Sequence, residues 1–194
     1  MTNEGAGQLP RLTITDPQLM RALAHPARQA ILDHLTGSGT VATATECARV
    51  AGLSPSATSY HLRELAKLGL VEEAPSRGDG RERVWRGTIS GLTVETVPEV
   101  ASETYAAARE LADVFLARNE ERVRRWRDRE HEEPPEWHRA AVVSESIVAM
   151  TAEELAELNE AVLALLEPYK RWRRADPPAG ARTIAVQYRT VPID

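Results

Sequence analysis

The fold of this 194-residue chain is constrained most by one feature of its sequence. That feature is a pair of short predicted helices joined by a glycine-centred turn and followed by two strand-like segments. Ser54-Pro55 combines a helix N-cap with a proline at the first helical position, and it predicts a helix over residues 55–68. The preceding helix is expected to end at Gly52, so that only Gly52-Leu53-Ser54 separates the two helices. Two short helices joined by such a turn are typical of the helix-turn-helix motif.

The segment before this motif carries further helix signals. Asp16-Pro17 repeats the pattern of a cap followed by proline and predicts a short helix. His25-Pro26 interrupts that helix, because proline disfavours helical backbone at the residue before it. A second helix is expected over residues 27–35, and either Thr43 or Thr45 can cap the helix that leads to the turn.

A β-hairpin is predicted after the motif. Residues 70–74 and 82–89 are strand candidates, and the polar turn between them holds Asp79-Gly80, which favours a tight hairpin. We expect Trp85 to pack on the domain. A hairpin added to a helix-turn-helix makes a winged helix, so the predicted fold is mainly α with a small β component (α+β).

The helix over residues 55–68 presents side chains suited to DNA. The major groove admits an α-helix, and base edges are read from the exposed N-terminal face of that helix. Helical spacing assigns four residues to the core: Thr58, Leu62, Leu65 and Leu68. The predicted DNA-binding residues lie on the other side: Ser54, Ser56, Ser59, Tyr60 and Arg63. Arg63 is the strongest candidate for a guanine or phosphate contact, and a solvated helix face without a partner is the alternative.

The hairpin adds arginines at its tip and along one strand. In a winged helix the tip lies against the DNA backbone or the minor groove, where the phosphates favour arginine. We therefore predict DNA contacts from Arg77, Arg81 and Arg83. The alternative is that these charges protect edge strands from aggregation.

Several stretches of the sequence resemble the ArsR family of bacterial transcription regulators. They are Leu23-Ala24-His25-Pro26-Ala27-Arg28, Ile31-Leu32, Thr58-Ser59-Tyr60-His61-Leu62-Arg63-Glu64-Leu65, Leu68-Gly69-Leu70-Val71, Gly78-Asp79-Gly80-Arg81 and Val84-Trp85-Arg86. The resemblance covers residues 14–91, about 40% of the chain. It implies a homodimeric winged helix-turn-helix protein that binds operator DNA, usually as a repressor relieved by an effector.

Many ArsR-like proteins sense metals, but this sequence departs from the thiolate pattern of that family. Cys47 is the only cysteine, whereas a soft-metal site needs two or three sulfur ligands. We therefore predict that Cys47 is buried in the core. Five further candidates surround Pro134-Pro135 and are interpreted as a solvated charge run: Asp128, His131, Glu132, Glu133 and His138. His25 and His61 fall within the family motifs and are interpreted as structural. No metal or other cofactor is expected.

The second half of the chain is expected to mediate dimerisation. Residues 100–129 read as one long helix with apolar residues at alternating spacings of four and three, which is the pattern of a helix–helix seam. The predicted dimerisation residues are Tyr105, Ala108, Ala112 and Phe115. Packing of this helix against the chain's own C-terminal segment is the alternative.

A strand–helix–strand extension is predicted at the C-terminal end. Thr151 and Glu154 form a capping-box pattern, and the helix that they begin has a continuous apolar stripe. Residues 140–150 and 183–188 are the strand candidates on either side of this helix. The extension could enlarge the dimer, hold an apolar ligand or bind another protein.

These observations predict four regions: a flexible N-terminus (1–14), a DNA-binding winged helix (15–91), a dimerisation helix (92–133) and the extension (134–194). Residues 1–91 carry a net charge of +1 (10 basic, 9 acidic) and residues 92–194 a net charge of −6 (14 basic, 20 acidic). The acidity of the whole chain, −5, therefore belongs to the second half.

The predicted function is that of a sequence-specific transcription regulator, a dimeric repressor that binds a pseudo-palindromic operator through the helix 55–68 and the wing 75–83. The expected partners are double-stranded DNA, a second copy of the chain and a small-molecule effector of unknown identity. The alternative is a winged-helix interaction module whose extension binds a protein or a small ligand. No catalytic frame is recognisable, so we expect no enzyme activity. We expect a cytoplasmic protein without a membrane partner, because no segment reads as a membrane span or signal peptide.

Overall fold

The computed structural model describes residues 9–38, 41–76, 82–94, 102–170, 174 and 176–193. The chain divides into two compact units. Unit 1 comprises Met1–Val114 and Pro168–Thr183, and unit 2 comprises Phe115–Glu167 and Ile184–Asp194. In the described part of the chain, no helix is long and apolar enough to cross a membrane.

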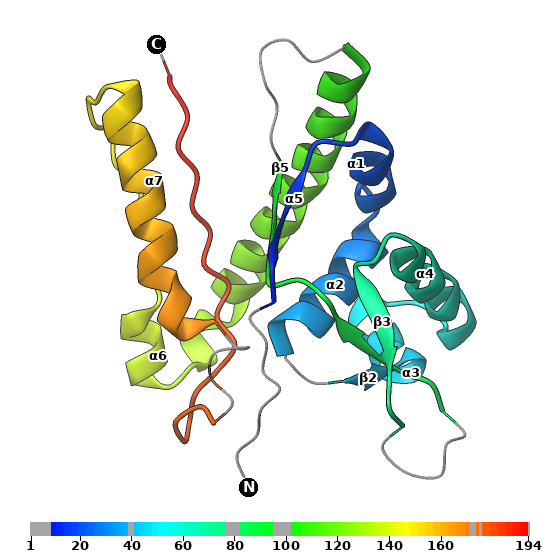
Figure 1. Cartoon of the computed structure of the whole chain (residues 1–194). Helices are drawn as coiled ribbons and strands as arrows, with labels where there is room; N and C mark the ends of the chain where they lie inside the picture. Colours follow the sequence, from blue (N-terminus) through cyan, green and yellow to red (C-terminus); the bar gives the residue numbers. More distant parts are fainter. Residues whose placement is uncertain are drawn as a thin grey trace, which may run out of the picture. The chain divides into compact units, whose positions relative to one another are not determined.

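Unit 1 contains four consecutive short helices (Figure 1). They are α1 (Pro17–Leu23), α2 (Pro26–Ser38), α3 (Ala44–Ala51) and α4 (Pro55–Lys67). The predicted break at His25-Pro26 is confirmed. Gly52 ends α3 in the left-handed conformation, with a φ of 66°, which glycine adopts without a steric penalty.

The capping side chains explain where these helices begin. The Asp16 carboxylate accepts a hydrogen bond from the Gln18 amide at 3.0 Å. Thr43, rather than Thr45, caps α3, and it forms a reciprocal capping box with Glu46. Ser54 caps α4 by accepting from the Ala57 amide at 3.2 Å.

The predicted hairpin is confirmed and belongs to a three-stranded antiparallel sheet. Its strands are β2 (Ala42–Thr43), β3 (Val71–Ala74) and β4 (Val84–Gly87), in the order β2-β4-β3. The short strand β2 was not predicted, because two residues carry too little pattern to identify a strand. Helices α3 and α4 with this sheet make a winged helix-turn-helix, so the α+β fold is as predicted.

The core of unit 1 lies where α2 and α4 meet β4. Leu62 and Leu65 of α4 are fully buried together with Ile31 of α2, and Thr58 is buried as predicted. Leu68 is 37% exposed and does not belong to the core, because α4 ends at Lys67 and Leu68 is its C-cap. Trp85 is 5% exposed, which confirms that it packs on the domain.

Strand β4 approaches α2 closely at Gly87. A Cβ atom built on Gly87 would lie 3.0 Å from Thr36 Cγ2 and 3.2 Å from the Leu35 carbonyl carbon. Such contacts are tighter than carbon atoms normally accept. A side chain at this position would therefore require α2 or β4 to shift by a few tenths of an ångström.

A second, parallel pair of strands corrects the predicted N-terminal boundary. Strand β1 (Arg11–Ile14) pairs with β5 (Gly91–Val94), and Ile14 is fully buried. Arg11 Nε also donates a hydrogen bond to Thr93 Oγ1 at 2.6 Å. A flexible terminus through residue 14 is therefore wrong for these four residues, and the predicted boundary between residues 91 and 92 falls inside β5. A four-residue parallel strand whose partner lies about 80 positions away has no local signal.

The remaining described residues are mostly helical or extended. The elements are α5 (Ser102–Arg129), a 3-10 turn (Glu130–Glu132), α6 (Pro135–Ala140), α7 (Ala152–Leu166) and a second 3-10 turn (Glu167–Tyr169). The capping box of Thr151 and Glu154 begins α7 as predicted. The strands expected over residues 140–150 and 183–188 are wrong as described: Ala140 ends α6, and residues 141–150 and 181–193 contain no strand. A strand needs a hydrogen-bonding neighbour, which these segments do not have within the described residues.

Candidate nucleic-acid interface

One side of α4 presents most of the side chains predicted to bind DNA. Ser54, Ser56 and Arg63 are exposed, Tyr60 is 50% exposed, and Ser59 is half-buried. Lys67 extends this face by one further helical turn, although the sequence reasoning did not select it. Its position four residues after Arg63 is the signal that could have found it.

Two of the hydroxyl groups on this face, those of Ser54 and Ser59, already take part in hydrogen bonds of the helix. Ser54 Oγ is the acceptor of the α4 cap, and Ser59 Oγ donates to the Pro55 carbonyl at 2.9 Å. These two serines can therefore accept a further bond, but their geometry is set by the helix. Arg63, by contrast, has no hydrogen-bond or ion-pair partner among the described residues, so its five N–H donors are open to a ligand.

A carboxylate close to Arg63 belongs to a separate ion pair. Lys67 Nζ lies 2.7 Å from Glu64 Oε1, and this hydrogen bond lowers the pKa of the Glu64 carboxyl below its ordinary value. Glu64 is therefore ionised at neutral pH, and it reduces the positive charge that Lys67 adds to the face.

The wing carries arginines that pair with the neighbouring strand. Arg83 Nη1 lies 3.0 Å from Glu73 Oε1, and Arg86 Nε lies 2.7 Å from Glu72 Oε1. All four side chains are at least 50% exposed, so each pair contributes little to stability and can open to admit a phosphate. Arg77 and Arg81, the predicted tip contacts, lie outside the described residues.

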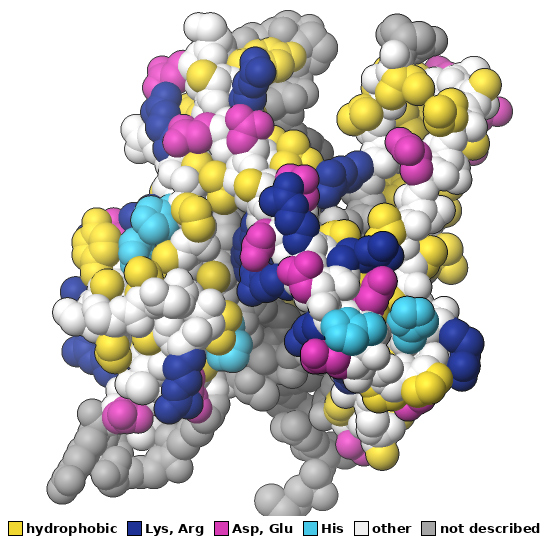
Figure 2. Space-filling model, turned by 180° about the vertical axis from the view of Figure 1, so that it is seen from behind, with side chains coloured by type: hydrophobic (Ala, Val, Ile, Leu, Met, Phe, Trp, Pro, Cys, Tyr) yellow, Lys and Arg dark blue, Asp and Glu magenta, His cyan; other side chains and the backbone are white. Residues whose placement is uncertain are grey.

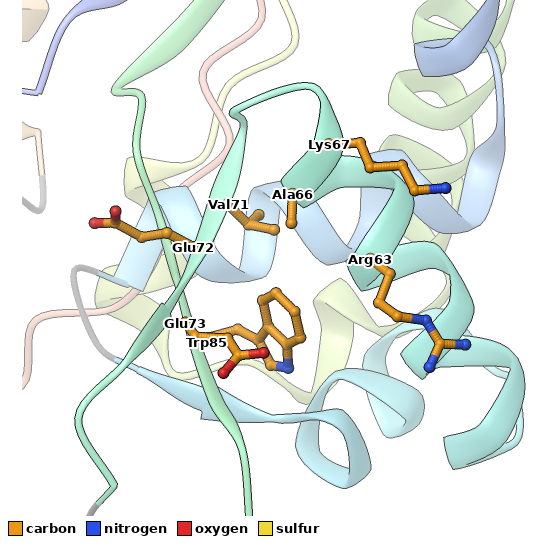
Figure 3. A pocket seen from close by; sticks show the side chains of 7 residues that line it. All are labelled: Arg63, Ala66, Lys67, Val71, Glu72, Glu73 and Trp85. Carbon is orange, nitrogen blue, oxygen red and sulfur yellow. The ribbon is translucent and has the colours of Figure 1, made fainter.

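A shallow, open depression lies between α4 and the strands β3 and β4 (Figure 3). Trp85 lies within it, and Arg63 and Lys67 extend from α4 at its edge (Figure 3). Glu73 lies beside the indole, whereas Glu72 points to the other side of β3 (Figure 3). Positive groups on the helix thus stand next to a wing whose arginines are partly neutralised by β3.

A pair of histidines joins α4 to the junction of α1 and α2. The rings of His61 and His25 are 4.6 Å apart, and His25 Nδ1 accepts a hydrogen bond from the Ala27 amide at 3.2 Å. His61 is only 9% exposed, and its Nδ1 is buried without a hydrogen-bond partner. Burial, together with the positive potential of His25 and Arg28, lowers the pKa of His61, so His61 is neutral at pH 7. This arrangement agrees with the structural role assigned to both residues.

Cys47 is completely buried, as predicted, and burial raises the pKa of its thiol to about 11. A thiol with this pKa is protonated at neutral pH and is a poor metal ligand. The residues near Pro134-Pro135 do not come together either: the described residues include no group of three or more His, Cys, Asp or Glu side chains that could hold a metal.

The predicted dimerisation residues fall on two sides of α5. Ala108 is buried within the chain together with Ala107 and Leu111, and Phe115 is half-buried. Tyr105 is 50% exposed, and Ala112 is also exposed. Leu116, which the sequence reasoning did not select, is 43% exposed and lies one turn after Ala112. Tyr105, Ala112 and Leu116 are therefore exposed apolar residues along one side of α5.

Comparison with known proteins gives a match to the winged-helix part of the chain. Residues 23–74 match a family model described as a helix-turn-helix domain. The HTH-type transcriptional regulator YgaV of Escherichia coli (strain K12) is 47% identical over 55 residues, which are 28% of this chain and 54% of that protein. The chain thus spans about half the length of this curated relative.

Solved structures give weaker similarities. A "possible transcriptional regulator for arsenical resistance" is 29% identical, with 53% of this chain and 85% of that chain covered and a TM-score of 0.31. The zinc-responsive MarR family member ZitR of Lactococcus lactis is 17% identical, with 74% of each chain covered and a TM-score of 0.32.

Proposed function

We propose that this protein is a sequence-specific DNA-binding transcription regulator that reads DNA with α4 and the wing. The observation that carries the proposal is Arg63, an exposed arginine without an internal partner, on the second helix of a helix-turn-helix. An arginine in this position can donate two hydrogen bonds to a guanine or hold a phosphate. The 47% identity to a transcriptional regulator over the matched residues supports the same conclusion.

The finer features of this function rest on the ArsR resemblance and on α5. A homodimer would place two copies of α4 on a two-fold operator, and the exposed Tyr105, Ala112 and Leu116 offer an apolar stripe for pairing. In the proposal, residues 15–91 bind DNA, the dimer acts as a repressor in the bacterial cytoplasm, and an effector relieves repression. The remaining predicted contacts of the wing, from Arg77, Arg81 and Arg83, belong to the same proposal.

The test is the affinity of the full chain for the duplex upstream of its own gene, measured against a scrambled duplex of equal length. Arg63→Ala is expected to weaken specific binding by about 1–3 kcal/mol and to reduce discrimination between the two duplexes. Arg124→Ala is the matched control, because it removes one exposed arginine from α5 instead. Equal effects of the two substitutions would contradict a reading role for Arg63.

A protein-interaction module is the second candidate, and the many exposed apolar side chains between Val142 and Ile193 favour it. The two candidates differ in their dependence on salt. DNA binding by a dimer that holds several phosphates should weaken with a log–log slope of roughly −4 or steeper. Absence of any salt-sensitive DNA binding by the wild-type protein would favour the second candidate.

A further inference from the structure

Unit 2 has apolar side chains but no core of its own. None of its described residues is buried, although α7 carries the apolar stripe of an amphipathic helix. Two extended segments of unit 2 are more exposed than α7 itself. They are residues 141–150, and residues 184–193 beside α7 (Figure 1). We call them segment A (141–150) and segment B (184–193). Figure 2 shows hydrophobic side chains on the surface of the part of the chain that holds α7.

Two polar side chains of segment B bond to its own chain, while its large apolar side chains remain exposed. Gln187 Nε2 donates a hydrogen bond to the Asn119 carbonyl at 3.0 Å, and Thr190 Oγ1 donates to Asn159 Oδ1 at 3.0 Å. Ile184, Val186 and Tyr188 are nevertheless 61%, 60% and 41% exposed, and Val191 and Ile193 are 73% and 75% exposed. Large apolar side chains are thus exposed along the whole of segment B, although two of its polar side chains hold it to α5 and α7.

The exposed apolar area is large enough for a stable interface between two chains. Ten large apolar side chains of segments A and B are 39–82% exposed: Val142, Val143, Ile147, Val148, Met150, Ile184, Val186, Tyr188, Val191 and Ile193. If each can remove roughly 60–120 Å² of apolar surface from water, the ten together offer roughly 600–1,200 Å² per copy. This range includes the ~800 Å² per partner of a standard protein–protein interface.

The two segments also complement each other. Both contain β-branched residues that favour strands, and neither has a strand partner within the described residues. Segment A carries one charge, that of Glu145, and segment B carries the opposite charge, that of Arg189. In a two-fold dimer, segment A of each copy can meet segment B of the other, so that one contact, made twice, gives all four segments a neighbour.

We propose that unit 2 is completed by unit 2 of a second copy, with segment A of one chain forming a β-strand against segment B of the other. This proposal extends the dimer of the proposed function. It assigns to the C-terminal part of the chain an interface separate from the stripe on α5, and it explains why two strand-like sequences lack neighbours within one chain.

The first test measures the dissociation constant of the full-length dimer without DNA by sedimentation. Ile147→Asp with Val186→Asp places one charge in each segment and is expected to raise the dissociation constant at least about 100-fold. The control is Val50→Asp with Leu53→Asp, which changes two exposed apolar residues of unit 1 and should leave the constant unchanged. An unchanged constant in the unit 2 variant, or a wild-type protein that stays monomeric at micromolar concentration, would overturn the proposal.

The second test does not depend on the stability of a charged variant. A chain with Val143→Cys and a chain with Val186→Cys, distinguished by their tags, are mixed and oxidised. The native thiol of Cys47 is buried. A disulfide that joins the two different chains is expected. If both substitutions in one chain give only an internal disulfide, segments A and B pair within the chain, and the proposal is wrong.

The outcomes separate this proposal from the proposed function. A monomeric protein that still binds the upstream duplex would leave the function standing and overturn the interface. A cross-linked dimer without salt-sensitive DNA binding would support the interface and contradict the proposed function. Protection of segments A and B by an unrelated protein, with no cross-link between copies, would identify a different occupant and also overturn the proposal.

Discussion

His61 connects α4 to the junction of α1 and α2 through its contact with the ring of His25. Its ring lies 4.6 Å from that of His25, and its buried Nδ1 has no hydrogen-bond partner. The charged groups around it come from three places: His25 before α2, Arg28 on α2, and Glu64 on α4. Glu64 alone favours the protonated ring, while burial and the other two groups oppose it.

The fold should therefore lose stability on acidification through His61. The pKa of His61 in the folded protein lies below 6.5, so the unfolded chain binds the proton more readily. The stabilisation that the neutral His61 ring gives the folded protein is complete above about pH 6.5, the pKa of histidine in the unfolded chain. It is lost as the pH falls through the pKa of His61 in the folded protein. We expect the urea midpoint to fall between pH 7.5 and 5.5, and to fall less in His61→Gln. An equal fall of the midpoint in the wild-type protein and in His61→Gln would contradict this role of His61.

At the scale of elements, the sequence predicts those boundaries that local contacts determine. The starts of α1, α3, α4 and α7 each depend on a side chain that bonds an amide two or three residues later. Such signals lie within one turn of helix and can be read directly from the sequence. The wrong strand assignments at residues 140–150 and 183–188, and the unpredicted β1, have the opposite cause. A strand depends on a partner that is distant in the sequence or lies on another chain.

The same distinction applies to the candidate site. Helical spacing placed Ser56, Tyr60 and Arg63 on one exposed side of α4, where the structure also has them. It did not show that Glu72 and Glu73 pair with wing arginines, because these contacts cross between strands β3 and β4. Helical spacing also did not show that Ala108 is buried and Ala112 exposed, because burial on α5 depends on which element packs against each side.

The beginning of α3 offers a test of capping with an internal control. Thr43 Oγ1 accepts from the Glu46 amide at 3.2 Å, while the Glu46 carboxylate accepts from the Thr43 amide at 2.6 Å. Thr43→Ala is therefore expected to reduce the free energy of unfolding by about 1 kcal/mol, measured by urea denaturation. Thr45→Ala, at the exposed alternative position, should change it by less than about 0.5 kcal/mol. The reverse order would mean that Thr45 is the cap in solution.

At the scale of the whole molecule, the net charge of −5 conceals the distribution that matters for DNA. The arginines proposed to contact DNA lie on α4 and the wing, but β3 places Glu72 and Glu73 beside two wing arginines. These carboxylates repel phosphates and occupy the guanidinium groups that would bind them. If the proposed contacts are made, we expect these ion pairs to limit non-specific DNA binding in a way that the total charge does not reveal.

Removing this limit should strengthen binding to any duplex. In the double variant Glu72→Gln and Glu73→Gln, Arg83 and Arg86 lose their carboxylate partners and become available to phosphates. We expect affinity for a scrambled duplex to rise by roughly 3- to 10-fold at low salt. The slope of log affinity against log salt should become more negative by about 1–2 per chain, because each new phosphate contact adds about 0.9.

The matched control is Glu120→Gln with Glu121→Gln. This variant has the same change in net charge, and it also releases two arginines, Arg124 and Arg125, from ion pairs, but these lie on α5. Affinity and slope that rise equally in both variants would show that total charge governs binding and would exclude a local effect of the wing. A rise confined to the variant at Glu72 and Glu73 would locate the phosphate contacts near β3 and β4, because only that variant frees Arg83 and Arg86.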